Sequence, residues 1–214
     1  MSSVRITDIT KTKKGFNALF TQDGFLFSVD DMLLYQENIK IGSCFSEQEL
    51  DCLMQKSQTA KAVEKAYSLL SYRMHSRKEL YDKLRKFYEQ DCALFAVDKM
   101  EGLGLVNDRV FAQLKGEYLL NVKKTSLCHI KLKLQSLGID KEIIEEVISD
   151  FEIDSQSQDI LRLLKSKYAS KLETPQKVIQ SLMRKGFKYS DIKQAFEELN
   201  LSVDEDFQTD YNEE

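Results

Sequence analysis

Few side chains in this sequence combine in a way that could support catalysis. There are two histidines, and His75 immediately precedes a predicted helix start, where a packing or capping role fits better than that of a catalytic base. The eight glycines are scattered and form no phosphate-binding loop. Two acidic pairs, at 145–146 and 197–198, lie on polar helix faces, where carboxylates are normally solvated. We therefore expect a protein that is not an enzyme and needs no cofactor.

The cysteines fit a reducing compartment. The four are Cys44, Cys52, Cys92 and Cys128. They are widely spaced and form no Cys-x-x-Cys pair, which is typical of reduced thiols in a cytoplasm. Cys128 is adjacent to His129, but neighbouring helical residues point to different faces and make a poor metal pair. We therefore expect no metal site. Because no apolar run approaches membrane-spanning length and no signal peptide is apparent, we expect a soluble cytoplasmic protein.

The net charge of −4 comes from one end of the chain. Of the 35 acidic residues, six lie in residues 204–214, which hold no base, so the rest of the chain carries 31 basic against 29 acidic residues. Such an acidic end is typical of a disordered tail. The body is near neutral with local basic clusters, which are either solvated helix faces with internal pairs or contacts to a partner or DNA.

Nine basic side chains are the candidates for such contacts. They are Arg73, Arg77, Lys78, Arg85, Lys123, Lys124, Arg184, Lys185 and Lys188. Arg77, Lys78 and Arg85 belong to one predicted helix, and Arg77 has no acidic residue at the i, i+4 spacing that supports pairing. Lys78 and Arg85 are seven residues apart and so share a face of that helix.

A helical unit that appears three times must position these residues. In each copy a Ser or Thr is followed four and eight residues later by apolar residues. The three series are Ser76, Leu80 and Leu84; Ser126, Ile130 and Leu134; and Thr174, Val178 and Leu182. Ser and Thr are N-cap residues, whose side-chain oxygen accepts a free backbone N–H, and the i, i+4 spacing places both apolar markers on one helix face. A repeat of this length predicts an array of stacked helical units.

Each copy also predicts a helix before and a helix after this one. The preceding helices carry Val63, Ala66 and Leu70; Phe111, Leu114 and Tyr118; and Leu161, Leu164 and Tyr168. The following helices carry Leu94, Val97 and Met100; Ile144, Val147 and Ile148; and Ile192, Ala195 and Phe196. Gly138 and Gly186 fall where the middle helices of copies two and three end, a position that favours glycine. The first copy lacks this glycine.

The first 58 residues have a different pattern. Apolar and polar residues alternate on both sides of Asp23-Gly24, which predicts a β-hairpin, with Val4 and Ile6 as a third strand. Asp30 is expected to cap a short helix, and a capping box at Ser46 opens another. The polar segment 55–58 is the candidate boundary with the helical array.

The predicted class is therefore mainly α: a tandem array of three three-helix repeats, elongated and curved, preceded by a small N-terminal β-hairpin region. The expected parts are an N-terminal region at 1–58, repeats at 59–107, 108–153 and 154–203, and a disordered acidic tail at 204–214. Stacked helical units present an extended surface, which suits partner binding better than small-molecule chemistry.

Four motifs in this array resemble those of one family. The stretch 70–80 resembles an Arg-x-x-Ser-x-x-Glu-Leu pattern, and 104–112 resembles Gly-x-x-Asn/Asp-Asp-x-x-Phe-Ala. The turns at 134–139 and 183–187 resemble Lys-Gly-Ile and Arg-Gly-Phe, except that Leu137 stands where a basic residue is usual. Together, in this order and over residues 60–200, they resemble RecX, the regulatory family of the RecA recombinase.

The resemblance implies a regulator in homologous recombination, DNA repair and the SOS response. It implies that the chain binds the RecA–DNA filament and restrains RecA ATPase, strand exchange and filament growth, with possible direct contact to single- or double-stranded DNA. We expect a monomer without membrane contact. The alternative interpretation is a free-standing helical DNA-binding protein, which requires a continuous basic stripe across the units.

Overall fold

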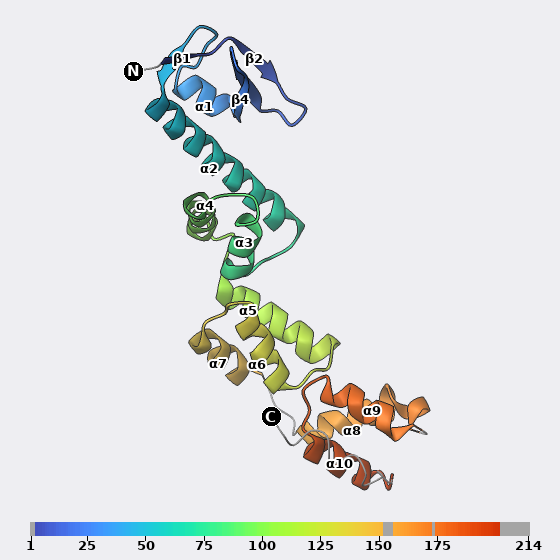
Figure 1. Ribbon diagram of the computed structural model, residues 1–214. Coiled ribbons are helices and arrows are strands. Elements are labelled where there is room, and N and C mark those ends of the chain that lie inside the picture. Colours follow the sequence, from blue (N-terminus) through green and yellow to red (C-terminus); the bar gives the residue numbers. More distant parts are fainter. Residues whose placement is uncertain (1–2, 152–155, 173, 202–214) are drawn as a thin grey trace. The chain divides into compact units, whose positions relative to one another are not determined.

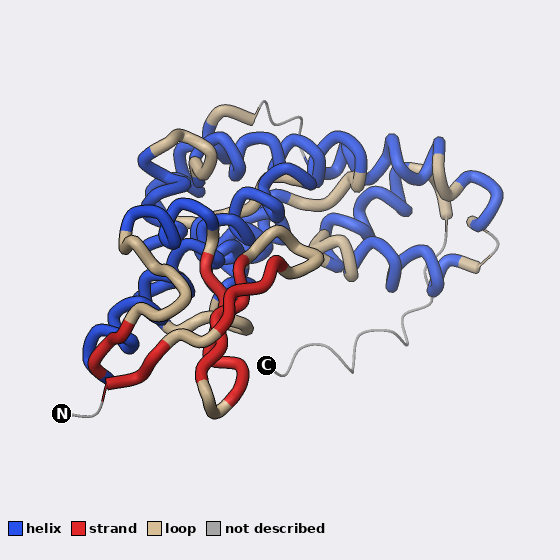
Figure 2. The backbone as a smooth tube through the Cα atoms, turned by 90° about the horizontal axis from the view of Figure 1, so that it is seen from above, coloured by secondary structure: helices blue, strands red, loops and turns tan. Residues whose placement is uncertain are grey.

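The structure is a computed structural model that describes residues 3–151, 156–172 and 174–201. It divides into two compact units, Met1–Asn107 and Asp108–Glu214, each of which is described by itself. In the described residues, strands occur only near the N-terminus and the rest is mainly helical, as the colouring of Figure 2 shows. The predicted class, three-helix repeats after a small β region, is confirmed.

The predicted hairpin is present in the first unit (Figure 1). Strands β2 (Asp8–Lys11), β3 (Asn17–Thr21) and β4 (Gly24–Val29) form an antiparallel sheet in the order β2-β3-β4. Gly24 lies at the turn between β3 and β4 and has φ of 110°. A residue with a Cβ would adopt this backbone conformation only under strain. The pairing of β3 with β4 is interrupted by a shift in register between Leu19 and Phe20.

The predicted third strand is wrong. Strand β1 (Ser3–Arg5), which contains Val4, pairs instead with β5 (Cys44–Ser46) in a separate two-stranded sheet. The backbone of Ile6 is bonded to the loop before β5, through its N–H to the Ser43 carbonyl and its carbonyl to the Gly42 N–H. These long-range bonds hold β1 away from the hairpin, whose third strand is β2.

Both predicted helix caps in this region are confirmed. The Asp30 carboxylate accepts the Leu33 N–H at 2.6 Å and opens α1 (Asp31–Gln36). Ser46 and Glu49 form a complete capping box at the start of α2 (Glu47–Tyr72). Helix α2 has 26 residues and continues through 55–58, so no linker lies where the boundary was predicted. The segment is polar but contains neither glycine nor proline, so nothing in it ends a helix.

Helix α2 thus serves both the β region and the first repeat. Its N-terminal half packs through Leu50 and Leu53 against a core from the strands and α1, which includes Leu19, Val29 and Leu33. Its C-terminal half packs through Ala62 and Ala66 against α3 (Arg77–Leu84) and α4 (Gln90–Gly102). The buried markers of this repeat are Leu80, Leu84, Val97 and Met100.

The second unit holds the other two repeats. The second repeat consists of α5 (Asp108–Glu117), a π-helical segment η1 (Tyr118–Val122), α6 (Leu127–Ser136) and α7 (Lys141–Ser149). The third consists of α8 (Gln156–Ser166), a 3₁₀ turn η2 (Ala169–Lys171), α9 (Pro175–Met183) and α10 (Tyr189–Glu198). Each repeat has its own apolar core, and Gly138 and Gly186 take the predicted left-handed conformation, with φ of 79° and 84°.

One predicted apolar face is wrong at two of its three residues, whereas the third, Phe111, is buried as predicted. Leu114 and Tyr118 were expected in the core of the second repeat, but Leu114 is 51% exposed and Tyr118 is 42% exposed. The buried face of this helix runs through Ala112, Gly116 and Leu119 instead. The reason is close packing: a Cβ at Gly116 would come within 2.7 Å of the ring of Phe151.

Candidate functional site

Arg73 is engaged in a pair within the first repeat. Its guanidinium donates to both oxygens of Glu79, at 2.9 and 2.5 Å, and to the Met74 carbonyl. Hydrogen bonding from Arg73 lowers the pKa of the Glu79 carboxyl, and the same pair raises the pKa of Arg73. Arg73 therefore contributes to the turn between α2 and α3, and its charge is compensated.

Arg77 is also compensated, by partners that helix periodicity cannot reveal. It lies in the first turn of α3, and its guanidinium contacts Asp98, at 2.5 Å, and Glu101 on α4. These carboxylates are more than twenty residues away in the chain and reach Arg77 because α3 packs against α4. Arg77 therefore has carboxylate partners outside the i, i+4 spacing, and its contact with a partner molecule stays a prediction.

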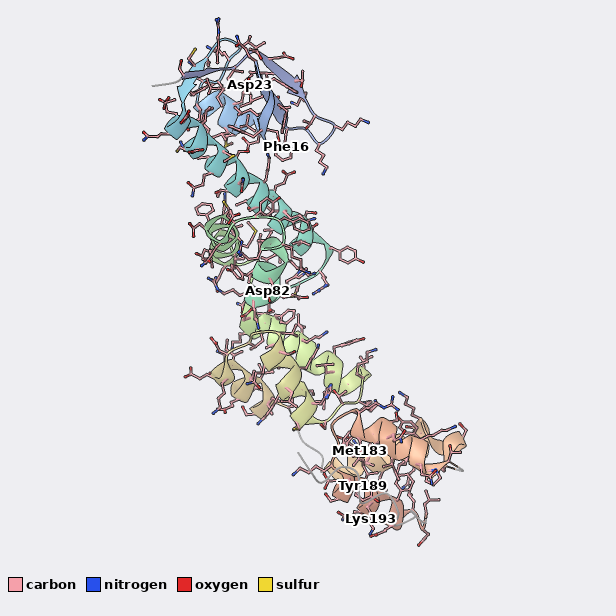
Figure 3. The ribbon with its side chains drawn as sticks, in the orientation of Figure 1. Phe16, Asp23, Asp82, Met183, Tyr189 and Lys193 are labelled. Carbon is pink, nitrogen blue, oxygen red and sulfur yellow. The ribbon has the colours of Figure 1, made fainter. Side chains whose placement is uncertain are left out.

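Lys78 in α3 and Arg85 at the C-cap of the same helix are both exposed, but their contacts differ. Arg85 donates to the Tyr88 carbonyl at 2.7 Å and so supports the turn in which the first repeat lacks a glycine. Lys78 makes no ion pair with any of the residues that the structure describes. Asp82, labelled in Figure 3, is exposed on the same helix and shows that this surface carries both signs of charge.

Lys123 and Lys124 come together with Lys185 in the second unit, although Lys185 lies 62 and 61 residues further along the sequence. The Lys185 ammonium donates to the Lys123 carbonyl and, at 3.2 Å, to the Lys124 carbonyl. Two further bonds join the same segments: the Ser126 N–H to the Lys185 carbonyl at 2.9 Å, and the Ser126 hydroxyl to the Gly186 carbonyl at 2.7 Å. The loop before α6 is thereby joined to the loop after α9.

The surroundings of Lys185 are basic. Burial lowers the pKa of its ammonium, and the charges of Lys167 and Lys123 lower that pKa further. Lys167 stands outside the contiguous basic clusters of the sequence and was not among the predicted contact residues. Lys115 and Lys123 both lie over the ring of Tyr118, with Nζ 5.5 and 5.6 Å from the ring centroid, and this arrangement was not predicted. The i, i+3 spacing of Lys115 and Tyr118 is the signal that could have revealed the first of these contacts.

Arg184 and Lys188 are exposed and have local roles. Arg184 caps the end of α9, and its Nε lies 3.4 Å from the Gln180 carbonyl one turn earlier. Lys188 is the N-cap residue of α10, whose helix carries Tyr189 and Lys193 (Figure 3). No contact in the described residues joins either of them to the lysines around Lys185.

A hollow of about 490 Å³ lies beside Lys124. Its polar lining includes Arg162 but also three carboxylates, which are those of Glu117, Asp150 and Asp159. The mixture of charges does not favour an anion, and none of the residues that line this hollow is a histidine or a cysteine. We assign it no chemistry.

His75 is a structural residue, in agreement with the prediction from sequence. Its ring is 2% exposed, with Nδ1 2.9 Å from the Arg73 carbonyl and Nε2 2.8 Å from the Lys83 ammonium. Burial lowers the pKa of the imidazole, and the neighbouring charge of Arg73 lowers it further. A neutral ring that donates from Nδ1 and accepts at Nε2 satisfies both contacts.

The described residues contain no set of three or more His, Cys, Asp or Glu side chains placed to hold a metal ion. Cys92 is buried, and Cys44, Cys52 and Cys128 are exposed free thiols. Within the same residues, no helix is both long and apolar enough to cross a membrane. Three small helical repeats with basic surface residues define a class: a helical-repeat protein suited to contact with macromolecules.

Comparison with known proteins identifies the family. A family model described as "RecX, first three-helix domain" matches residues 62–100. The regulatory protein RecX of Clostridioides difficile (strain 630) is 30% identical over 94% of this chain and 97% of its own length. That of Bacillus velezensis is 32% identical over 94% of this chain and 80% of its own length. The chain belongs to the RecX family of regulatory proteins.

Solved structures show the same fold. A crystal structure of a regulatory protein RecX aligns with 89% of this chain and 99% of its own, with a TM-score of 0.61 and 24% identity. The crystal structure of RecX from Lactobacillus salivarius aligns with 68% of this chain and 98% of its own, with a TM-score of 0.53 and 30% identity. The chain therefore shares its fold with these RecX structures, while its contact surface depends on its own side chains.

Proposed function

We propose that this RecX-family chain binds the RecA–DNA filament in the cytoplasm and restrains RecA ATPase, strand exchange and filament growth without catalysing a reaction itself. The observation that carries the proposal is the likeness to a regulatory protein RecX over 94% of the chain and 97% of that relative. The four motifs that resemble the RecX family lie in the same region, across all three repeats.

The arrangement in repeats supports a mode of action by several contacts. A filament presents the same surface many times, and each repeat of this chain offers a separate exposed surface. Contacts that are weak singly raise the apparent affinity when they engage together, because the second contact is made at a high effective concentration. This mode needs no deep pocket.

The proposal is tested by measuring RecA ATPase on circular single-stranded DNA while the chain is titrated in, with the RecA of the same bacterium. We expect inhibition that increases with concentration, and no ATP hydrolysis by the chain alone. Binding to preformed filaments and to bare DNA is measured in parallel, across salt. An unchanged ATPase rate together with no binding to filaments contradicts the proposal, and equal affinity for filaments and bare DNA favours the free-standing DNA-binding protein.

A further inference from the structure

The second unit gathers lysines that are far apart in the sequence. Lys115 and Lys123 both lie over the ring of Tyr118. Burial lowers the pKa of the Lys185 ammonium, and the charges of Lys167 and Lys123 lower it further, so these three lysines lie close together. We call Lys115, Lys123, Lys167 and Lys185 the lysine cluster.

The lysine cluster has no counter-charge among the described residues. None of its four members has a carboxylate at ion-pair distance within that part of the chain. Glu117, which precedes Tyr118 in the sequence, accepts instead from the Gln113 amide at 2.8 Å. Like charges gathered without counter-charges repel each other, so a polyanion bound to this surface stabilises it.

The chain itself contains a segment of the opposite charge. Residues 204–214 hold six carboxylates and no basic residue, together with two aromatic residues, Phe207 and Tyr211. This segment, which we predicted to be a disordered acidic tail, lies outside the residues that the structure describes. Six negative charges in so short a stretch are the complement of four lysines without counter-charges.

The acidic segment follows the third repeat and can reach the lysine cluster. Helix α10 ends in a tight turn, in which Asn200 has φ of 53° and the Leu201 N–H donates to the Phe196 carbonyl at 3.0 Å. Lys185 lies just before the other end of the same helix, on the order of 20 Å from Leu201 by the helical rise per residue. Residues 202–214 span up to roughly 40 Å when extended, so their length allows the contact.

Exposed apolar side chains beside the lysines suit the aromatic residues of this segment. Tyr118 is 42% exposed, and Leu114 and Val122, each one turn away from it, are 51% and 65% exposed. Phe207 and Tyr211 supply apolar surface that such a patch can bury. An acidic segment that carries two aromatic residues therefore matches both the charge and the apolar character of this surface.

We propose that residues 204–214 bind the lysine cluster of their own chain, and that an external polyanion binds this surface only by displacing them. The contact is autoinhibitory, because the apparent affinity for the external polyanion is reduced by the fraction of molecules in which the surface is free. It is also sensitive to salt, since exposed charges are screened as the ionic strength rises.

The first test is carbodiimide cross-linking of the full chain, which joins a carboxylate to an amine that it contacts, followed by mass spectrometry. We expect links from residues 204–214 to Lys123 and Lys167 but not to Lys131 and Lys133, which are exposed lysines of α6 in the same unit. A mixture of isotope-labelled and unlabelled chains identifies links between molecules. The absence of links to Lys123 and Lys167, equal frequencies at both pairs, or links only between molecules overturn the proposal.

The second test compares two full-length variants that lose the same six charges. The neutral-tail variant has each Asp replaced by Asn and each Glu by Gln at Asp204, Glu205, Asp206, Asp210, Glu213 and Glu214. The control variant has the same replacements at six exposed carboxylates of the first unit, which are Asp23, Asp51, Glu64, Asp82, Glu89 and Asp91. The probe is a fluorescent oligothymidylate of about 30 nucleotides, and its anisotropy is measured across salt without RecA.

We expect the neutral-tail variant to bind the probe about tenfold more tightly than the wild type at low salt, as when the acidic segment covers the surface about nine-tenths of the time. The difference should shrink as salt is raised. No gain in the neutral-tail variant, or an equal gain in the control variant, overturns the proposal. If no variant binds the probe, the cross-links decide. Because neither test contains RecA, its failure leaves the proposed regulatory function unaffected.

Discussion

The hydroxyl of Ser126 donates to the carbonyl of Gly186 at 2.7 Å, and so joins the N-cap of the middle helix of one repeat to the helix-ending glycine of the next. The same hydroxyl accepts the His129 N–H at 3.2 Å as a helix cap. One side chain thus serves both the local helix and the contact between repeats. At this junction, two of the residues that mark the repeat in the sequence also join one repeat to the next.

This contact predicts that Gly186→Ala is strongly destabilising. Gly186 has φ of 84°, and a Cβ there would lie 2.6 Å from the His129 Cβ and 2.6 Å from the Ser126 Oγ. We expect a loss of on the order of 2 kcal/mol or more in the free energy of unfolding, measured by chemical denaturation. Gly104→Ala is the matched control, because Gly104 has φ of 71° but nothing within 4 Å of its Cβ position. Equal losses in both variants would mean that backbone strain alone matters and that the contact between repeats does not.

The second repeat predicts a large effect from Leu134→Ala. Leu134 is fully buried among Ile130, Ile144 and Val147. Truncation of such a side chain leaves a cavity and costs roughly 2–5 kcal/mol in the free energy of unfolding. Leu132 on the same helix is 59% exposed, so Leu132→Ala should change stability by less than about 0.5 kcal/mol. A small loss for Leu134→Ala would show that the register of α6 is different.

His75 predicts a specific pH dependence of stability. Its folded-state pKa is lowered, so between that value and the unfolded pKa of about 6.5 the unfolded chain binds more protons than the folded chain. Stability should therefore be fully present above about pH 6.5 and fall as the pH decreases through the folded pKa. The charges that face the ring contribute to the lowered pKa of His75. Arg73 and Lys83 both oppose protonation of the ring, and Glu79 only partly offsets them.

The measurement is the free energy of unfolding by urea at pH 5 to 8. We expect His75→Gln to have a flatter profile than the wild type, because an amide can replace both ring contacts without titrating. The pKa values of the Glu79 and Glu49 carboxyls are lowered, so their protonation occurs at lower pH and does not affect the comparison of wild type with His75→Gln. Parallel profiles for wild type and His75→Gln would contradict the role assigned to His75.

The repeat frame could be predicted from the sequence because it depends on local signals. Ser76 and Ser126 cap helices through bonds to the N–H three residues later, and Gly138 and Gly186 end helices by their own conformation. These features involve neighbours within a few residues, so the residue types alone determine them.

What could not be predicted depends on contacts between distant segments. Strand β1 was assigned to the wrong sheet because its partner, β5, lies some forty residues away. Leu114 has the spacing of a core residue, but Gly116 lets Phe151 approach a different face of the helix. The lysines around Lys185 are likewise collected by the contact between two repeats, and spacing within one helix does not report that contact.

The basic residues of α3 give the last prediction, which separates charge from fold. A simultaneous reversal of Arg77, Lys78 and Arg85 is a poor test of partner binding, because two of the three have structural contacts. Arg77→Glu would place a carboxylate against Asp98 and Glu101, and we expect a loss of roughly 1 kcal/mol in stability. Arg85→Glu would remove the donor to the Tyr88 carbonyl.

Lys78→Glu is the informative single change. Lys78 is exposed in the first turn of α3, where an acidic side chain is compatible with the helix dipole, so the melting temperature should be unchanged. If this face of the first repeat meets the filament, the reversal should raise several-fold the concentration that halves RecA ATPase on single-stranded DNA, and more so at low salt, where charges are less screened. Lys86→Glu, past the end of the same helix, is the control. Full potency of a folded Lys78→Glu variant would contradict a contact through Lys78 and make the lysines around Lys185 in the second unit the next candidates.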